Sequence, residues 1–535
     1  MENAIATAPT YFPFGNRYDK IDKRYKFSRR TDLRTLGADY PIHENQNIRI
    51  YYDDRKVHLH QRRQSKLDST PSNVERMFPG DSLPDVILLT IFKYMHPLDL
   101  INGISMVSKR WNKLSNAPSN YRSVRVVIDG DSVRSGSARA FLQRGAMCIK
   151  QLCLDYETEI SPGCLADVLP ECMPSVTLLD IGFVADIRSN IDALLRCFPN
   201  VEILNMEHVA GVDRESVEKI FSRDSFPRLR RFYIGPMWEI RGGAIRKLLS
   251  WERRLEVLLI RGISDISFVG IECSPFISTL TELYLHCGFL TQPSYSPIGM
   301  LKNLKKLSIN STIGTPGEEL LHLKTLCNLE HLHMDCCGQD CDFSPMSIAE
   351  FFRLPDENPS DYFPYRLKYL NFSNCYEVNG ESVPVIVKSC PDLESLNIRC
   401  NEFMGEEAFS LIIKNLKKLR FLDVSEMGEM TCDALRNLSN DDLPQLQFLA
   451  IHRTQVSHRI LEKLNKKRPK LIITKRMNHF INWSRQDGKT HISKEFDGDV
   501  NAVLNDLSEM EGFCCMGRVS RYPWPENAWM YDMGV

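Results

Sequence analysis

A short apolar pattern recurs along most of this 535-residue chain and constrains its fold more than any other feature. The pattern reads apolar-x-x-apolar-x-apolar. Twelve clear copies begin at Ile149, Val176, Val201, Leu229, Leu255, Leu280, Leu304, Leu329, Leu367, Leu393, Leu419 and Leu446, and a degenerate copy begins at Leu471. Successive copies lie 24 to 28 residues apart, except for one interval of 38 residues that indicates an insertion.

This spacing is typical of leucine-rich repeats. Copies such as LTELYLHC from Leu280 alternate as short strands do, and helical patterns such as ESVPVIVKSCPD separate them. Cys337, Cys375 and Asn401 stand at the ninth position, where such repeats carry Asn or Cys to bond the backbone at the turn. One repeat cannot bury its apolar face alone, so the repeats must stack. We predict an α/β leucine-rich-repeat solenoid, a horseshoe with strands on one side and helices on the other, over residues 149–475.

Charge and composition exclude several classes of protein. Lys plus Arg number 67 against 68 Asp plus Glu, and the net charge of -1 argues against binding to nucleic acid or to a membrane surface. The first twenty residues lack the apolar stretch of a secretory signal, and nowhere do about 18 apolar residues run uninterrupted. We therefore expect an intracellular protein, cytoplasmic or nuclear, whose 17 cysteines are reduced thiols.

Three further segments flank or join the patterned regions. Residues 1–76 are polar and predicted to be mostly disordered, and their Arg29-Arg30 pair fits a weak nuclear-import signal or a solvated tail. Residues 121–148 are predicted to be a linker or an N-terminal cap of the solenoid. Residues 476–535 hold half of the six tryptophans. Two interpretations of this last segment stay open, a cap on the final repeat and a tail that folds back along the concave strand face.

Residues 77–120 predict a small all-α unit. Apolar residues at helical spacing give a first helix an apolar stripe, formed by Ile87, Leu88, Ile91, Phe92 and Met95. Pro84 suits the first turn of that helix, and His96-Pro97 ends it. A second segment opens at Asp99 and Leu100, and VSKRWNKL predicts a third helix. Three helices this short are marginal without a partner, and the wide stripe favours a docking element.

The same residues resemble the F-box. Its pattern of Leu-Pro-Glu/Asp, Ile-Leu, Ile-Phe, Tyr-Leu, Asp-Leu, Val-Cys and Arg-Trp is met in register by Leu83-Pro84-Asp85, Ile87-Leu88, Ile91-Phe92, Tyr94-Met95, Asp99-Leu100, Val107-Ser108 and Arg110-Trp111. Met95 and Ser108 are mild departures. An F-box before long leucine-rich repeats resembles the F-box/leucine-rich-repeat protein family over about residues 80–475.

The resemblance implies a non-catalytic substrate receptor of an SCF-type cullin-RING ubiquitin ligase. In that family the F-box binds a Skp-type adaptor and, through it, a cullin and a RING subunit, while the repeats hold the protein to be ubiquitinated. The adaptor-facing positions carry over to Leu83, Pro84, Ile87, Leu88, Ile91, Leu100, Val107 and Trp111. A scaffold that binds a partner without promoting ubiquitination is the second hypothesis, and a plain repeat-binding protein is the third.

Motifs for catalysis, cofactors and metals are missing from the sequence. It holds no G-x-x-x-x-G-K-S/T, G-x-S-x-G, H-E-x-x-H or paired C-x-x-C pattern, so we expect no enzyme activity, cofactor or metal. Cys336, Cys337 and Cys341 with His331 and His333 could be drawn as a zinc cluster, but the place of Cys337 at the repeat turn argues against it. The insertion, which ends at residues 352–366, fits a tolerated surface loop or a rim loop that contacts substrate.

The alternation of the strands predicts a substrate surface. The fourth and sixth residues of each repeat point into the core, the third, fifth and seventh face the concave side, and the second lies at its margin. In four successive repeats these positions hold Arg230, Arg231, Tyr233, Arg261, Tyr284, His286, Lys305 and Lys306, opposed by Glu256 and Glu282. Such residues suit an acidic or phosphorylated segment, although basic side chains here can simply keep the face soluble.

Overall fold

The structure is a computed structural model of the whole chain. It describes residues 48–52, 83–474 and 483–492. Short gaps within these ranges fall at 96, 122–123, 129–132, 134–136, 155–163, 183, 185–186, 208, 210, 236–242, 262–267, 287–294, 311–314, 336–342, 355–362, 374, 376, 402, 428–429, 452–453, 469–470 and 487–488. The Cys336, Cys337 and Cys341 cluster, the Cys514-Cys515 pair and most of residues 1–76 and 493–535 lie outside the described residues.

One sheet of 15 strands follows the chain order from β1 to β15. β1 (Ile48–Tyr52) pairs antiparallel with β2 (Val124–Ile128), and the strands from β2 onward are parallel. The later strands are β3 (Gln151–Leu154), β4 (Leu178–Asp180), β5 (Ile203–Glu207), β6 (Arg231–Gly235), β7 (Val257–Arg261), β8 (Glu282–His286), β9 (Lys306–Asn310), β10 (His331–Asp335), β11 (Tyr369–Asn371), β12 (Ser395–Asn397), β13 (Phe421–Asp423), β14 (Phe448–Ala450) and β15 (Ile472–Thr474).

The predicted leucine-rich-repeat solenoid is confirmed strand by strand. From β3 to β14 each strand begins two residues after the start of a predicted copy, and β15 begins one residue after Leu471. The first, fourth and sixth residues of a copy face the core, as Leu255, Leu258 and Ile260 do with none of their surface exposed. Since every repeat contributes the same three positions, the core runs continuously through the stack.

Four short strands lie in segments where the repeat pattern gives no signal. β2 lies in the predicted linker or cap. The repeat pattern misses this strand because Ser123 stands where a copy has its first apolar residue, although Val126 and Ile128 are buried as in the other repeats. β1 lies within residues 1–76. β16 (Trp483–Gln486) and β17 (Lys489–Ile492) form a separate antiparallel hairpin around Asp487-Gly488, a dipeptide that favours two-residue turns.

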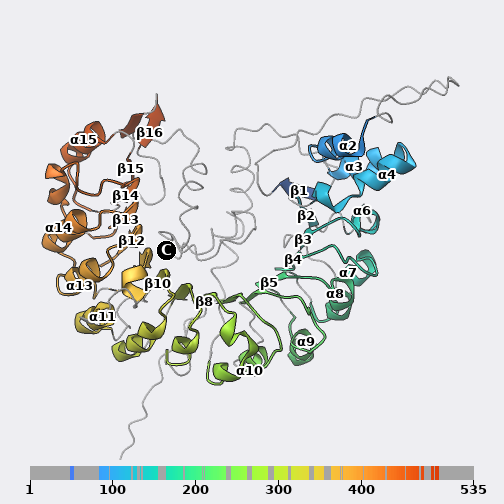
Figure 1. Cartoon of the computed structure of the whole chain (residues 1–535), viewed down its shortest axis with the longest axis horizontal. Coiled ribbons are helices and arrows are strands. Elements are labelled where there is room, and N and C mark those ends of the chain that lie inside the picture. Colours follow the sequence, from blue (N-terminus) through green and yellow to red (C-terminus); the bar gives the residue numbers. More distant parts are fainter. Residues whose placement is uncertain are drawn as a thin grey trace, which may run out of the picture. The chain divides into compact units, whose positions relative to one another are not determined.

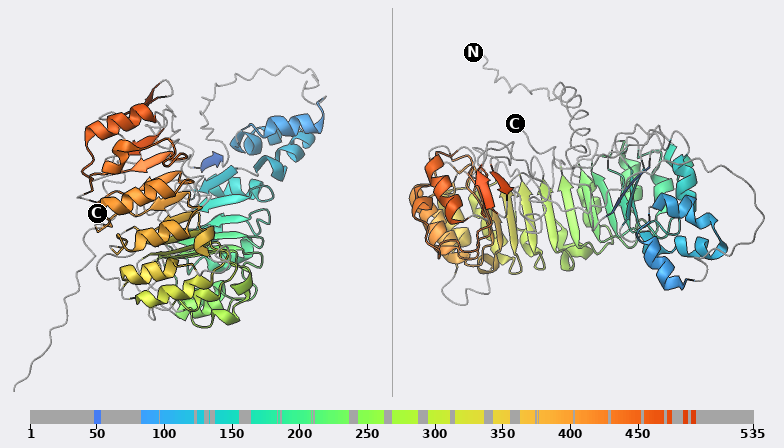
Figure 2. Two further views of the ribbon diagram at one scale, coloured as in Figure 1. Left: turned by 60° about the vertical axis from the view of Figure 1, so that its left-hand side comes forward. Right: turned by 90° about the horizontal axis from the view of Figure 1, so that it is seen from above.

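Helices connect the strands and lie on the outer side of the sheet, while the strands line the inner side (Figure 1 and Figure 2). They are α6 (Ser137–Gly145), α7 (Cys164–Val168), α8 (Ile191–Cys197), α9 (Arg214–Ile220), α10 (Gly243–Leu249), η5 (Ile271–Cys273), η6 (Pro275–Ser278), η7 (Ile298–Met300), η8 (Gly317–Thr325), α11 (Pro345–Phe352), α12 (Phe363–Arg366), α13 (Ser382–Ser389), α14 (Glu406–Asn415), η11 (Asp433–Asn437) and α15 (His458–Lys467). α12 belongs to the insertion. No described helix has the length and apolarity that crossing a bilayer requires.

Polar side chains tie each repeat to the one before it. At the ninth position, Asn401 Nδ2 donates to the carbonyls of Phe372 (2.9 Å) and Ile398 (2.8 Å), and Cys375 Sγ donates to the Met334 carbonyl (3.4 Å). This is the backbone bonding predicted for that position.

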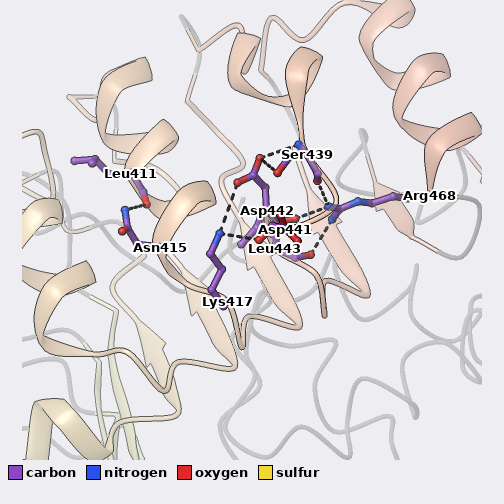
Figure 3. A network of polar contacts seen from close by, with 8 residues as sticks. All are labelled: Leu411, Asn415, Lys417, Ser439, Asp441, Asp442, Leu443 and Arg468. Carbon is purple, nitrogen blue, oxygen red and sulfur yellow. Dashed lines mark hydrogen bonds and ion pairs between the residues drawn. The ribbon is translucent and has the colours of Figure 1, made fainter.

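The outer ends of the last repeats carry a larger network (Figure 3). Arg468 donates to the carbonyls of Leu443 (2.8 Å), Ser439 (3.0 Å) and Asp442. The Asp442 carboxylate in turn accepts from the Ser439 amide (2.8 Å) and lies 3.6 Å from Lys417 Nζ. Three consecutive repeats are therefore linked through one loop.

Candidate functional site

The helical unit before the solenoid contains α2 (Asp85–Phe92), α3 (Pro97–Asn102), η3 (Ile104–Met106) and α4 (Lys109–Ser115). Pro84 lies at the N-cap rather than in the first turn, and its carbonyl accepts from the amides of Ile87 (3.0 Å) and Leu88 (3.1 Å). α2 ends at Phe92, before the predicted stop at His96-Pro97, and Pro97 instead begins α3.

Hydrogen bonds cap the start of α4 and connect α4 to the start of α2. Ser108 caps α4 by accepting from the Trp111 amide at 3.1 Å. Arg110 donates to the Asp85 carboxylate (2.7 Å) and to the Leu83 carbonyl, so α4 holds the start of α2 in place.

The apolar stripe of α2 divides between two faces. Leu88 and Phe92, four residues apart, are each 1% exposed and pack inside the unit, whereas Ile87 and Ile91 are 45% and 44% exposed. The prediction of an apolar face wider than the unit's own core is consistent with this division.

The eight predicted adaptor-facing residues differ in exposure. Ile87, Ile91, Val107 and Pro84 are exposed, and Leu83 and Trp111 are half-buried. Leu88 and Leu100 are buried in the core. Exposed apolar residues that the sequence prediction missed are Val86, Tyr94 and Met106.

The predicted basic substrate residues are partly neutralised by neighbouring carboxylates. Arg230 Nη1 lies 3.1 Å from Glu256 Oε1, and Lys306 Nζ lies 3.1 Å from Glu282 Oε1. Arg231 and Lys305 are exposed. Arg261 and His286 end β7 and β8, and the structure describes only their backbone. The charge predicted from spacing is therefore reduced by ion pairs across neighbouring strands.

The two predicted tyrosines belong to an apolar cluster on the inner face. Tyr233, Leu259 and Tyr284 are direct partners in the register of β6, β7 and β8. With Val257 and Ile203 they form a cluster separate from the solenoid core, and these five residues are called the apolar patch below. Tyr233, Val257 and Leu259 are only 2%, 3% and 0% exposed. The Tyr284 hydroxyl lies 2.8 Å from Glu282 Oε2, to which it donates.

The composition of β7 indicates this patch, although the spacing of the repeats does not. β7 reads Val257-Leu258-Leu259-Ile260, apolar at every position, and such a run is typical of strands covered on both faces. Alternation alone predicts that the odd residues of this strand are polar and solvated. Burial also raises the pKa of the Tyr233 hydroxyl, so it stays protonated.

The C-terminal half of the inner face is aromatic and polar. Phe421 and Phe448 stack at 4.6 Å between centroids, and His331 and Tyr369 stack at 4.0 Å, each pair on adjacent strands. Burial raises the pKa of the Asp423 carboxyl to about 6, and its Oδ1 accepts from the Ser425 amide at 2.9 Å.

At the fifth position of the repeat that begins at Leu329, burial lowers the pKa of the His333 imidazole to about 4, so the ring is neutral at neutral pH. Asn371 Nδ2 lies 3.1 Å from His333 Nδ1. Except for the half-buried Tyr369, these polar groups and aromatic rings of the C-terminal half are almost fully buried.

Among the described residues, no group of three or more His, Cys, Asp or Glu side chains could hold a metal ion. Burial raises the pKa of the Cys197 thiol to about 12 and that of Cys400 to about 11, which keeps both as weakly nucleophilic thiols.

Comparison with known proteins agrees with the two-part organisation. Residues 81–126 match the F-box-like family, which confirms the predicted F-box. No curated protein sequence matches the chain.

Similar solved structures include a chain of the crystal structure of the Rad7 and Elc1 complex in yeast, with 15% identity and a TM-score of 0.41 over 73% of this chain and 93% of that one. Another is a leucine-rich-repeat protein of Leptospira interrogans, with 16% identity and a TM-score of 0.38 over 72% of this chain and 97% of that one. Neither likeness bears on function.

Proposed function

Since the chain joins an F-box-like domain to a leucine-rich-repeat solenoid, we propose that it is the substrate-recognition subunit of an SCF-type ubiquitin ligase. In this role the F-box docks a Skp-type adaptor, which links it to a cullin and a RING subunit, and the repeats bind the protein to be ubiquitinated. The chain contributes binding and no catalytic group, in the cytoplasm or the nucleus.

The observation that carries the proposal is the exposed apolar surface within the F-box match. Ile87 and Ile91 lie one helical turn apart on α2 with nearly half of each side chain exposed, and Val107 adds 41% exposure. The buried pair Leu88 and Phe92 already supplies the contact of α2 with the core. The outer pair has no such packing role, so it supports docking of a partner.

The inner face of the solenoid is proposed to bind the substrate. The exposed side chains of Arg231 and Lys305 support binding of an acidic or phosphorylated segment. Arg230 and Lys306 contribute less positive charge, because each forms an ion pair, with Glu256 and Glu282 respectively. Capture of such a segment is expected to weaken as salt is raised, because exposed charges are screened.

The adaptor prediction is tested by Ile87→Asp/Ile91→Asp in the full chain. We expect the amount of Skp-type adaptor that co-purifies to fall about tenfold or more, because two charges then face an apolar interface. Met346→Asp, which changes a 65% exposed apolar residue on α11, is the matched control. Unchanged thermal midpoints would show that all chains fold, and full adaptor binding by the double variant would refute the F-box assignment.

The fate of the captured proteins distinguishes a substrate receptor from a scaffold that does not promote ubiquitination. Affinity purification from cells, with and without a blocker of cullin activity, is followed by mass spectrometry. A substrate receptor should accumulate some partners only under the block. The same partners should accumulate on Ile87→Asp/Ile91→Asp without the block, because the repeats still bind them while the adaptor is lost. Partners of equal abundance in both conditions would favour the scaffold.

A further inference from the structure

Three of the five residues of the apolar patch are almost fully buried, although the patch lies on the face of the sheet opposite to the helices. Leu259, Tyr233 and Val257 are 0%, 2% and 3% exposed, whereas their neighbour Arg231 is exposed. The described helices lie on the outer side of the sheet (Figure 1), so they do not explain this burial. Apolar side chains on an open sheet face lose contact with water when another segment lies over them.

We propose that the apolar patch is the docking surface of the chain's own C-terminal segment, residues 493–535. This inference rests on the repeats and not on the proposed role in a ubiquitin ligase. It selects one of the two interpretations that the sequence left open, and it places the segment over β5 to β8.

The segment is long enough to reach the patch. β7 lies eight strands from β15, and at about 4.8 Å per strand this is roughly 40 Å along the sheet. The 43 residues after Ile492 span up to about 140 Å when extended, at about 3.3 Å each.

Charge favours this segment over the others outside the described residues, whereas residues 1–47 hold seven aromatic residues and are no poorer in them. It is rich in aromatic residues, namely Phe496, Phe513, Tyr522, Trp524, Trp529 and Tyr531. It carries eight acidic and three basic residues, a net charge of -5, which complements the exposed Arg231 and Lys305 beside the patch. Residues 1–47 carry a net +2 and residues 53–82 a net +1, so both would add like charge to that rim.

The test uses the full-length chain with a photo-crosslinking benzoylphenylalanine in place of Tyr284, a half-buried member of the patch. After irradiation, mass spectrometry should locate crosslinks within residues 493–535 of the same chain. The same probe in place of Leu411, which is 36% exposed on α14, should give none. Crosslinks to residues 1–82, to a second copy, or to nothing would overturn the proposal.

A second variant leaves the solenoid untouched. Trp524→Ser/Trp529→Ser in the same full-length probe chain should lower the crosslink yield about tenfold or more, because two large apolar rings are lost from the docked segment. An undiminished yield at these positions would contradict docking through aromatic side chains. Neither experiment contains adaptor or substrate, so the outcome is independent of the proposed function.

Discussion

At the scale of single residues, position within the repeat decides the environment of a side chain. Asp423 illustrates this, because it holds the fifth position of the repeat that begins at Leu419 and is 1% exposed. The position turns its carboxylate toward the Ser425 amide, which it caps at 2.9 Å, but burial still favours the neutral acid. An ionisable group placed this way makes stability depend on pH.

We predict that Asp423 destabilises the chain as the pH rises through about 6. Its pKa is about 6 in the folded chain and about 3.9 in an unfolded one, so the folded state binds the proton more tightly. The stabilising contribution is full below about pH 4 and is lost as the pH rises through about 6, a change of roughly 2 to 3 kcal/mol. Asp423→Asn should match the parent near pH 4 and melt at a higher temperature at pH 7.5.

The measurement is the thermal midpoint by circular dichroism from pH 4 to 7.5. Asp441→Asn, at an exposed position, is the matched control. A difference between Asp423→Asn and the parent that stays constant across this range would show that the carboxyl does not titrate as described.

At the scale of elements, the repeats depend on side chains that satisfy the carbonyls of the preceding repeat. Asn200 donates to the Pro174 carbonyl (2.8 Å), Asn303 to Ser278 (2.7 Å) and Asn328 to Lys302 (2.9 Å). Arg468 does the same for three carbonyls of the loop before the last repeat. These bonds stabilise turns that a helix or strand ladder does not reach.

Arg468→Met should loosen the last repeat. Two half-buried carbonyls, of Asp442 and Leu443, and the exposed Ser439 carbonyl lose their donor, and each net hydrogen bond contributes about 1 kcal/mol. Arg468→Lys should recover only part, because an ammonium cannot reproduce the planar fork of donors. Hydrogen exchange of residues 439–446 and of α15 should be fastest in Arg468→Met, intermediate in Arg468→Lys and unchanged in Arg459→Met. Equal exchange in all three chains would exclude this role.

At the scale of the whole molecule, the F-box and the solenoid share one hydrophobic core. The cluster that begins with Leu88 and Phe92 continues through Ile101 and Ile149 to Ile473 in β15. The three short helices therefore obtain part of their burial from the first repeats. This arrangement supplies the support that the sequence predicted such a small unit to need.

Residues 83–121 alone should accordingly fail to fold. Without the repeats, Ile101 and Leu100 lose their cover, and a unit of this size buries too little apolar surface to offset its chain entropy. The isolated segment should show no cooperative thermal transition by circular dichroism, while the same residues in the full chain are protected from hydrogen exchange. A sigmoidal melt of the isolated segment would mean that its own core suffices.

The sequence by itself determined the repeats and the F-box because both depend on local patterns. Apolar residues at a fixed spacing place a strand wherever the chain must bury them, so β3 to β15 follow from Ile149 onward. The F-box follows from a dense motif in register. The sequence pattern did not predict β2, because Ser123 interrupts the apolar spacing there. This strand forms by pairing with β3.

Only the tertiary structure decided which side chains remain available for binding. Leu88 and Ile87 are adjacent on one apolar stripe, yet the packing of α2 on its neighbours buries the first and exposes the second. Arg230 and Glu256 are 26 residues apart and become an ion pair because the parallel register sets them side by side. Spacing along the chain specifies the repeat and the two faces of each strand. Ion pairs and the burial of individual side chains depend on contacts between elements that are distant in sequence.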